Sequence, residues 1–91
     1  MNSEFDPNKD VANRAKHGVS LGFGARLFDD PDMLIVPTIR SGDEEERYKA
    51  IGLVDGNVWT AVHTYRDTRI RFISVRRSNA GEQRAYHSDP G

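Results

Sequence analysis

The dipeptide Asp55-Gly56 restricts the possible folds of this chain more than any other feature of the sequence. Asp-Gly readily adopts the two left-handed backbone conformations that a two-residue β-hairpin turn needs. The segments on either side, Glu46–Val54 and Asn57–Tyr65, are rich in the β-branched and aromatic residues that strands favour. We therefore expect two long strands joined by a tight turn, and with them an antiparallel sheet built from short connections.

Two further segments extend this predicted sheet. The short turn Arg66–Thr68 leads into a third long strand, Arg69–Arg77. The apolar run Met33–Ile39 predicts a fourth strand, and Pro37 favours the edge of the sheet because proline has no N–H to donate. The charged segment Ser41–Glu45 would form the loop between this strand and the hairpin.

A capped helix is predicted near the start of the chain. Asp6 is suited to the N-cap position and Pro7 to the first helical position. The helix would run to Lys16 and stop at His17-Gly18, because glycine suits the left-handed conformation that follows a helix.

Two shorter helices complete the expected fold. Ser20 can cap a helix over Leu21–Phe28, whose apolar face would contain Leu21, Ala25 and Phe28. Asn79 and Glu82 have the spacing of a capping box and predict a terminal helix over Ala80–His87. The predicted class is α+β: a small antiparallel sheet with two N-terminal helices and a C-terminal helix, packed on one face of the sheet.

The composition of the chain excludes several classes of site and of protein. A chain of 91 residues is expected to form one domain, over residues 1–91, with a thin core. Cysteine is absent, which excludes disulfides, thiol chemistry and cysteine-bound metals. No apolar run approaches the ~20 residues of a membrane span, and residues 1–10 lack the apolar segment of a signal peptide. We therefore expect a cytoplasmic protein without a membrane partner.

Charge is unevenly distributed along the chain. Residues 1–61 carry 7 basic and 11 acidic side chains, whereas residues 62–91 carry 6 basic and 3 acidic ones. All six basic residues of the second part are arginines, which bind phosphate groups through two parallel hydrogen bonds. This concentration favours a site for a phosphate-rich ligand, and the alternative is a solvated face of the sheet.

Arg76 is the most informative of these arginines. In a regular strand it shares a face with Ile70 and Phe72, which have the character of core residues. A guanidinium in such a place needs a carboxylate, carbonyl groups or a ligand phosphate, because burying an unpaired charge is costly. Arg76 therefore belongs either to a ligand site or to a buried ion pair with Glu46 or Glu82.

Lys16 and His17 form a second candidate site at the predicted end of the first helix. Histidine titrates near neutral pH, and a helix C-terminus favours its protonated form, so a simple capping role is the alternative. The chain's other histidines, His63 and His87, complete no metal-ligand spacing with it, and the acidic run Asp43–Glu46 lacks the pattern of a calcium loop. We predict no metal and no cofactor.

Arginines, histidines, a lysine, a glutamate and tyrosines without a metal motif are the components of metal-independent RNA cleavage. RNA supplies its own nucleophile, the 2′-hydroxyl group. The protein then needs a general base, a general acid and cations that stabilise the phosphorane oxygens.

Five sequence regions, spread over nearly the whole chain, match the motifs of a known family in order and in spacing. Their combined order and spacing are specific to that family. They are Phe5-Asp6-Pro7-Asn8-Lys9; Asn13–Ser20; Phe28-Asp29-Asp30; Glu45-Glu46-Arg47-Tyr48 with Ile51-Gly52; and Thr64-Tyr65-Arg66 with Arg71–Arg77 and Glu82–Tyr86. In this order they resemble the BrnT family, the toxins of bacterial type II toxin–antitoxin pairs. The resemblance implies a RelE-like ribonuclease fold and RNA cleavage that inhibits translation. It also implies neutralisation by a BrnA-type antitoxin, whose ribbon-helix-helix dimer binds operator DNA, in a heterotetramer that represses its own operon.

The resemblance also assigns roles to individual residues. The catalytic residues would be His17, Glu46, Arg47, Arg66 and Arg76. His17 or Glu46 would act as general base or acid, and the three arginines would hold the scissile phosphate. The RNA-binding residues would be Lys16, Arg77, Glu82 and Tyr86.

A second interpretation keeps the fold but not the catalysis. The arginines could bind RNA, DNA or an acidic antitoxin segment without turnover, in a catalytically inactive module that acts in operon repression. Convergence of His17, Glu46 and the arginines in one pocket would favour the enzyme, whereas arginines engaged in surface salt bridges would favour the module. His63 matches no motif of the family, and we expect a partly buried histidine on a strand.

Overall fold

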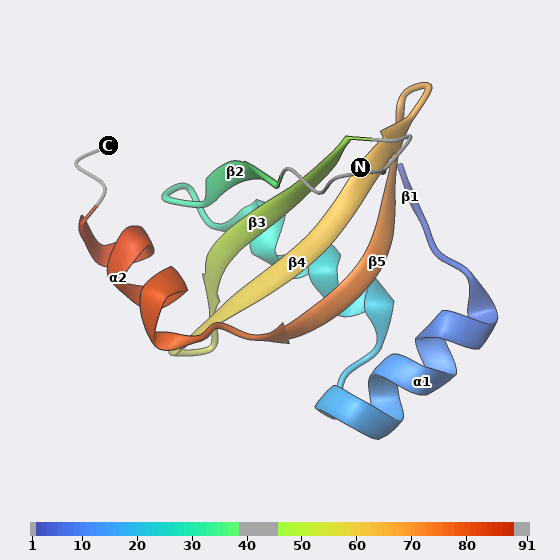
Figure 1. Ribbon diagram of the computed structural model, residues 1–91, viewed down its shortest axis with the longest axis horizontal. Coiled ribbons are helices and arrows are strands. Elements are labelled where there is room, and N and C mark those ends of the chain that lie inside the picture. The colour runs from blue at the N-terminus through green and yellow to red at the C-terminus, as the bar shows by residue number, and fades with distance from the viewer. Residues whose placement is uncertain (1, 39–45, 89–91) are drawn as a thin grey trace.

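A five-stranded sheet organises the protein (Figure 1). The structure is a computed structural model that describes residues 2–38 and 46–88. The strands lie in the order β1-β5-β4-β3-β2, with bounds β1 Ser3–Glu4, β2 Leu34–Thr38, β3 Arg47–Val54, β4 Asn57–Arg66 and β5 Arg69–Arg77. The helices are α1 Pro7–His17, the 3₁₀ helix η1 Leu21–Asp29 and α2 Ala80–Ser88. The predicted α+β class is confirmed.

The hairpin prediction is confirmed in its backbone geometry. Asp55 and Gly56 have φ angles of 50° and 83°, the two positive values that the turn requires. β2 to β5 are antiparallel, and β2 forms the predicted edge. The two-residue strand β1, which was not predicted, adds in parallel to β5. The predicted loop Ser41–Glu45 lies outside the described residues.

η1 differs from the predicted α-helix. Ser20 caps it as expected, by accepting a hydrogen bond from the Phe23 N–H. The predicted face is confirmed in part, because Leu21 is buried and Ala25 and Phe28 pack against the core. The fully buried positions, however, recur every third residue at Leu21, Gly24 and Leu27, and not at four-residue spacing. A Cβ atom on Gly24 would lie 2.7 Å from the Phe72 ring. Glycine therefore lets η1 pack closely against β5.

The apolar core lies between η1 and one face of the sheet. In Figure 1, η1 passes behind the strands. Phe23 of η1 packs on Trp59 with 4.7 Å between ring centroids, and Phe28 meets Phe72 edge-on at 6.0 Å. Fully or almost fully buried core residues are Leu21, Leu27, Ala50, Ala61, Phe72 and Val75.

A bulge interrupts the pairing of β4 with β5. Val62 pairs with Ser74, but the next residue, His63, pairs with Phe72. Ile73 is therefore an extra residue on β5. The side chains that follow such a bulge alternate between the two faces of the sheet one position out of phase with those that precede it.

This shift corrects the expected placement of Arg76. Phe72 and Val75 are both buried on the face that η1 covers. Arg76 pairs with Thr60 and faces the opposite side of the sheet, whereas Arg77 pairs with Trp59 on the η1 side. The prediction that Arg76 shares a face with Phe72 is wrong because the bulge was invisible in the sequence.

The helices were expected to pack on one face of the sheet, and this prediction is wrong. α1 runs along the β5 edge of the sheet and α2 lies near β3 (Figure 1). The first turn of α2 reaches the face opposite η1, where the Thr60 hydroxyl donates to Glu82 Oε1 at 3.0 Å. α2 begins with the predicted capping box, in which Asn79 and Glu82 each accept a hydrogen bond from the other's backbone N–H.

Candidate functional site

The sheet face opposite η1 carries basic side chains from three strands. We call it the cationic face and define it by Arg47, Lys49, Arg66, Arg69, Arg71 and Arg76. The cross-strand pairs place these residues on one side. No described helix crosses the front of β4 in Figure 1. Side chains of α2 reach one end of this face, where Thr60 is buried, and the basic side chains extend from there along the strands.

Glu82 organises one end of the cationic face. Its Oε1 and Oε2 atoms accept hydrogen bonds from the two terminal nitrogens of Arg76 at 2.7 and 2.8 Å, and Lys49 Nζ lies 3.0 Å from Oε2. Burial alone would raise the pKa of Glu82, but hydrogen bonds from Arg76, the Asn79 backbone, Lys49 and Thr60 lower it to about 2. Glu82 is thus a permanent carboxylate that positions two cations.

This arrangement settles how Arg76 is paired. The ion pair predicted as one alternative is confirmed, with Glu82 rather than Glu46 as the partner. Arg76 keeps 26% of its side chain exposed, so its guanidinium can also meet a ligand. Lys49 completes the cluster, and sequence reasoning missed it. Its position on β3, two residues after Arg47, is the signal that could have identified it.

His17 and Lys16 lie at the end of α1, next to the same cluster. Burial, Lys16 and Arg76 together lower the pKa of His17 below its ordinary value of 6.5. The expectation that the helix end favours the protonated form is therefore wrong in its net direction. His17 and Lys16 thus lie within electrostatic reach of Arg76, the arginine that Glu82 binds, and the neutral form of His17 is favoured.

Asn13 fixes α1 in this position, a role that sequence reasoning missed. Its side-chain NH₂ group donates to the carbonyl oxygens of Val19 and Val75, both at 2.9 Å. Its Oδ1 accepts from the Val75 N–H at 3.1 Å. Asn13 is 6% exposed. A single amide therefore joins the last turns of α1 to β5 and holds Lys16 and His17 beside the sheet.

Three predicted catalytic residues lie away from this group. The Glu46 carboxylate accepts a hydrogen bond from the Tyr48 hydroxyl at 2.6 Å, on the side of the sheet that η1 covers. Arg47 and Arg66 belong to the opposite end of the cationic face. Thr60, which pairs with Arg76, precedes Arg66 by six residues, or about 20 Å of strand.

Arg77 and Tyr86 also point elsewhere. The Arg77 guanidinium lies 5.3 Å from the centroid of the Trp59 ring, on the η1 side of the sheet. The Tyr86 hydroxyl donates to the Asp30 carboxylate at 2.6 Å. Burial and this hydrogen bond raise the pKa of Tyr86 to about 12. Both side chains thus have partners within the fold.

His63 is fully buried, where partial burial was expected. Its ring contacts Tyr48, Tyr65, Phe28 and Phe72. Nδ1 lies 3.0 Å from the Ala61 carbonyl oxygen, and Nε2 has no hydrogen-bond partner among the described residues. Burial lowers the pKa of His63, so the ring belongs to the core in its neutral form.

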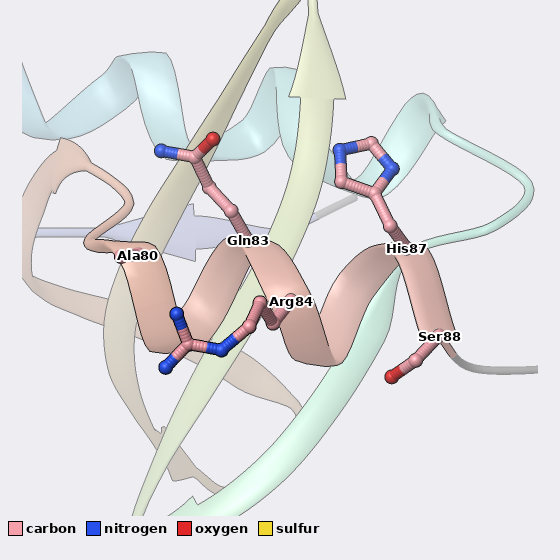
Figure 2. A pocket seen from close by; sticks show the side chains of 5 residues that line it. All are labelled: Ala80, Gln83, Arg84, His87 and Ser88. Atoms are coloured by element: carbon pink, nitrogen blue, oxygen red, sulfur yellow. The ribbon is translucent and has the colours of Figure 1, made fainter.

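A wide hollow of about 750 Å³ lies along the outer side of α2. Figure 2 shows that its labelled side chains, from Gln83, Arg84, His87 and Ser88, spread apart from the helix rather than converge. None of the predicted catalytic residues lines it. Its geometry does not suit a catalytic centre.

Within residues 2–38 and 46–88, no three histidine, aspartate or glutamate side chains gather in a way that could hold a metal ion. Over the same residues, no helix is both long enough and apolar enough to cross a membrane.

Comparison with known proteins identifies the family. A search of curated proteins found no significant match. Residues 5–82 match the family described as "Ribonuclease toxin, BrnT, of type II toxin-antitoxin system". This match covers most of the chain and includes α1, η1, the sheet from β2 to β5 and the start of α2. The resemblance inferred from the motifs is thereby confirmed, and the chain belongs to the BrnT family of ribonuclease toxins of type II toxin–antitoxin systems.

Proposed function

We propose that this toxin cleaves RNA without a metal ion, at the end of the cationic face where His17, Lys16 and Arg76 gather. The observation that carries the proposal is the electrostatic setting of His17. Its pKa is lowered by burial and by the two neighbouring cations, so the ring is ready to accept a proton at neutral pH.

The reaction follows from these positions. His17 takes the proton of the 2′-hydroxyl group while its oxygen attacks phosphorus. The bond from phosphorus to the 5′ oxygen breaks, which gives a 2′,3′-cyclic phosphate and a 5′-hydroxyl. We assign protonation of the leaving oxygen to Lys16. Arg76, oriented by Glu82, stabilises the charge that develops on the phosphorane.

The remaining predicted residues take other places in the proposal. Glu46 is not assigned as base, because its carboxylate lies on the other side of the sheet with Tyr48. Glu82 is not assigned either, because its pKa of about 2 makes it too weak a base. Arg47 and Arg66 would bind more distant phosphates of the same RNA strand along the cationic face.

The partner is implied by the resemblance to the BrnT family, and the cationic face offers a surface for it. A BrnA-type antitoxin with a ribbon-helix-helix domain would cover the cationic face with an acidic segment, because complementary charge favours and orients such binding. The complex would be a heterotetramer that contacts operator DNA through the antitoxin. Because the target is translated RNA, we place its action in the cytoplasm.

A second candidate function has its own supporting observation. Glu46, Arg47 and Arg66 do not converge with His17, as expected of a module that binds RNA or antitoxin without cleaving. Arg76 and Lys49 are moreover both engaged by Glu82. The two candidates differ in turnover and not in binding.

The test is cleavage of a purified RNA in the presence of EDTA. We expect the wild-type protein to cleave, and His17→Gln to lose about 10²- to 10⁴-fold in rate, the usual contribution of one proton-transfer group. His87→Gln is the matched control, because His87 is an exposed histidine on α2. Equal rates for His17→Gln and wild type would contradict the assigned base. RNA binding without cleavage, with and without ribosomes, would favour the inactive module.

A further inference from the structure

A narrow groove of about 170 Å³ runs between α1 and β5. One side is formed by α1, the other by the bulged part of β5, and its lining includes Lys9, Ala12, Lys16, His17, Ile73 and Ser74. It begins at the proposed catalytic pair, Lys16 and His17, and continues toward the start of α1. The part of the groove beyond Lys16 and His17 has no role in the proposed cleavage step.

The charge of the groove is positive along its whole length. Lys9 and Lys16 are two turns apart on α1, or about 10 Å along the helix axis. Asp10, the acidic residue of the first turn, is turned away: its carboxylate accepts from the Leu21 N–H at 2.7 Å and pairs with Arg14 at 3.2 Å. Among the described residues, none that lines the groove is acidic.

The shape of the groove is fixed by the fold. Asn13 joins α1 to Val75, so the helix cannot move away from the strand without losing two hydrogen bonds. Ala12 and Ser74 are small, which leaves room between the two elements. The bulge at Ile73 shapes the strand side.

We propose that this groove binds the RNA backbone phosphate next to the scissile one, with Lys9 as its principal ligand. The proposal rests on the RNA-cleaving function described above. Lys9 then acts on binding and not on the chemical step. Lys16 is shared between the two phosphates, since it lines the groove beside His17.

The test compares Lys9→Ala with Arg14→Ala, which removes an exposed cation on the same helix outside the groove. The probe is a 2′-O-methyl RNA of twelve mixed nucleotides, which cannot be cleaved through its 2′ position. We expect Lys9→Ala to raise Kd about fivefold, and to reduce the slope of log K against log salt by about 0.7, the value for one phosphate contact to a single strand. Lys9→Arg should restore both.

The same variants are assayed for cleavage of the unmodified RNA. Lys9→Ala should raise KM by a similar factor and leave kcat unchanged. Binding and salt slope equal to those of Arg14→Ala would overturn the proposal, as would a fall in kcat at unchanged KM. If the wild type binds RNA in a Lys9-dependent way but never cleaves it, the groove stands and the proposed catalysis fails.

Discussion

The two faces of the sheet are held in different ways. The η1 face is closed by apolar side chains and rings, with Leu21, Leu27 and Phe72 almost fully buried. At one end of the cationic face a single carboxylate, Glu82, holds Arg76, Lys49 and Thr60. Apolar packing spreads stability over many contacts, whereas the ionic cluster concentrates it in one residue. The first face is therefore held by many contacts, whereas this end of the second depends on one side chain.

The largest expected effect comes from removing that carboxylate. Glu82→Ala leaves Arg76 and Lys49 without their anion in a partly buried place, and breaks the capping box of α2. We expect a loss of about 3–5 kcal/mol in the free energy of unfolding, measured by urea denaturation. Arg84→Ala, an exposed cation on the same helix, is the control and should change stability little. A loss below about 1 kcal/mol would show that the cluster contributes charge and not stability.

The apolar face should respond to a single methyl group. Gly24→Ala places Cβ 2.7 Å from the buried Phe72 ring, so ring or helix must shift. We expect a cost of about 1–3 kcal/mol, seen as a lower Tm. Gly22→Ala is the matched control, since its Cβ would lie 3.6 Å from the nearest ring atom, on Phe5. Equal melting temperatures for the two variants would argue against tight packing between η1 and β5.

Acid should weaken the apolar face before it weakens the cationic face. Burial lowers the pKa of His63 below 6.5, so the unfolded chain binds more protons than the folded one as pH falls through 6.5. Stability should drop by up to about 1.4 kcal/mol per pH unit below that value. Glu82 contributes only at lower pH, between its ordinary value of 4.5 and about 2.

His63→Phe should flatten this pH dependence between pH 4.5 and 6.5. The comparison is made in a His17→Gln background, because the pKa of His17 is also lowered and titrates in the same direction. Urea unfolding across this pH range provides the measurement. An unchanged slope would mean that His63 is not the group that takes up the proton.

The smallest effect is expected for an exposed ion pair on neither face. Arg26 and Asp55 meet at 2.9 Å with side chains 52% and 74% exposed. Solvent screens such a pair, so Arg26→Gln should cost less than about 1 kcal/mol, and less again at high salt. A larger loss in urea unfolding would point to the contact of Arg26 with the Phe23 ring instead.

The parts of the fold that depend on a few neighbouring residues were predicted correctly from the sequence. The Asp55-Gly56 turn, the caps at Asp6 and Ser20 and the capping box at Asn79 were readable because each depends on a few neighbouring residues. Non-local features were not readable. β1 has only two residues and pairs with β5 across 67 positions of sequence, and the bulge at Ile73 depends on the register of two strands.

The site was predictable in its residue types more than in its geometry. Lys16, His17, Arg76 and Glu82 were named from the sequence and lie together. The bulge put Arg76 on another face than alternation suggested, and Glu46 turned toward Tyr48. Lys49 and Asn13 were missed because their roles depend on partners far away in the chain, Glu82 and Val75.

The Asn13 amide also affects whether the outer edge of β5 can pair with another molecule. β1 covers only the first residues of the outer edge of β5, at Ile70 and Arg71. Beyond them, the N–H and C=O groups of Val75 would be free to pair with a strand from another molecule, the usual route to edge-to-edge aggregation. Asn13 occupies both groups. The side chain that holds α1 against β5 therefore also occupies the Val75 backbone groups that a strand from another molecule would otherwise pair with.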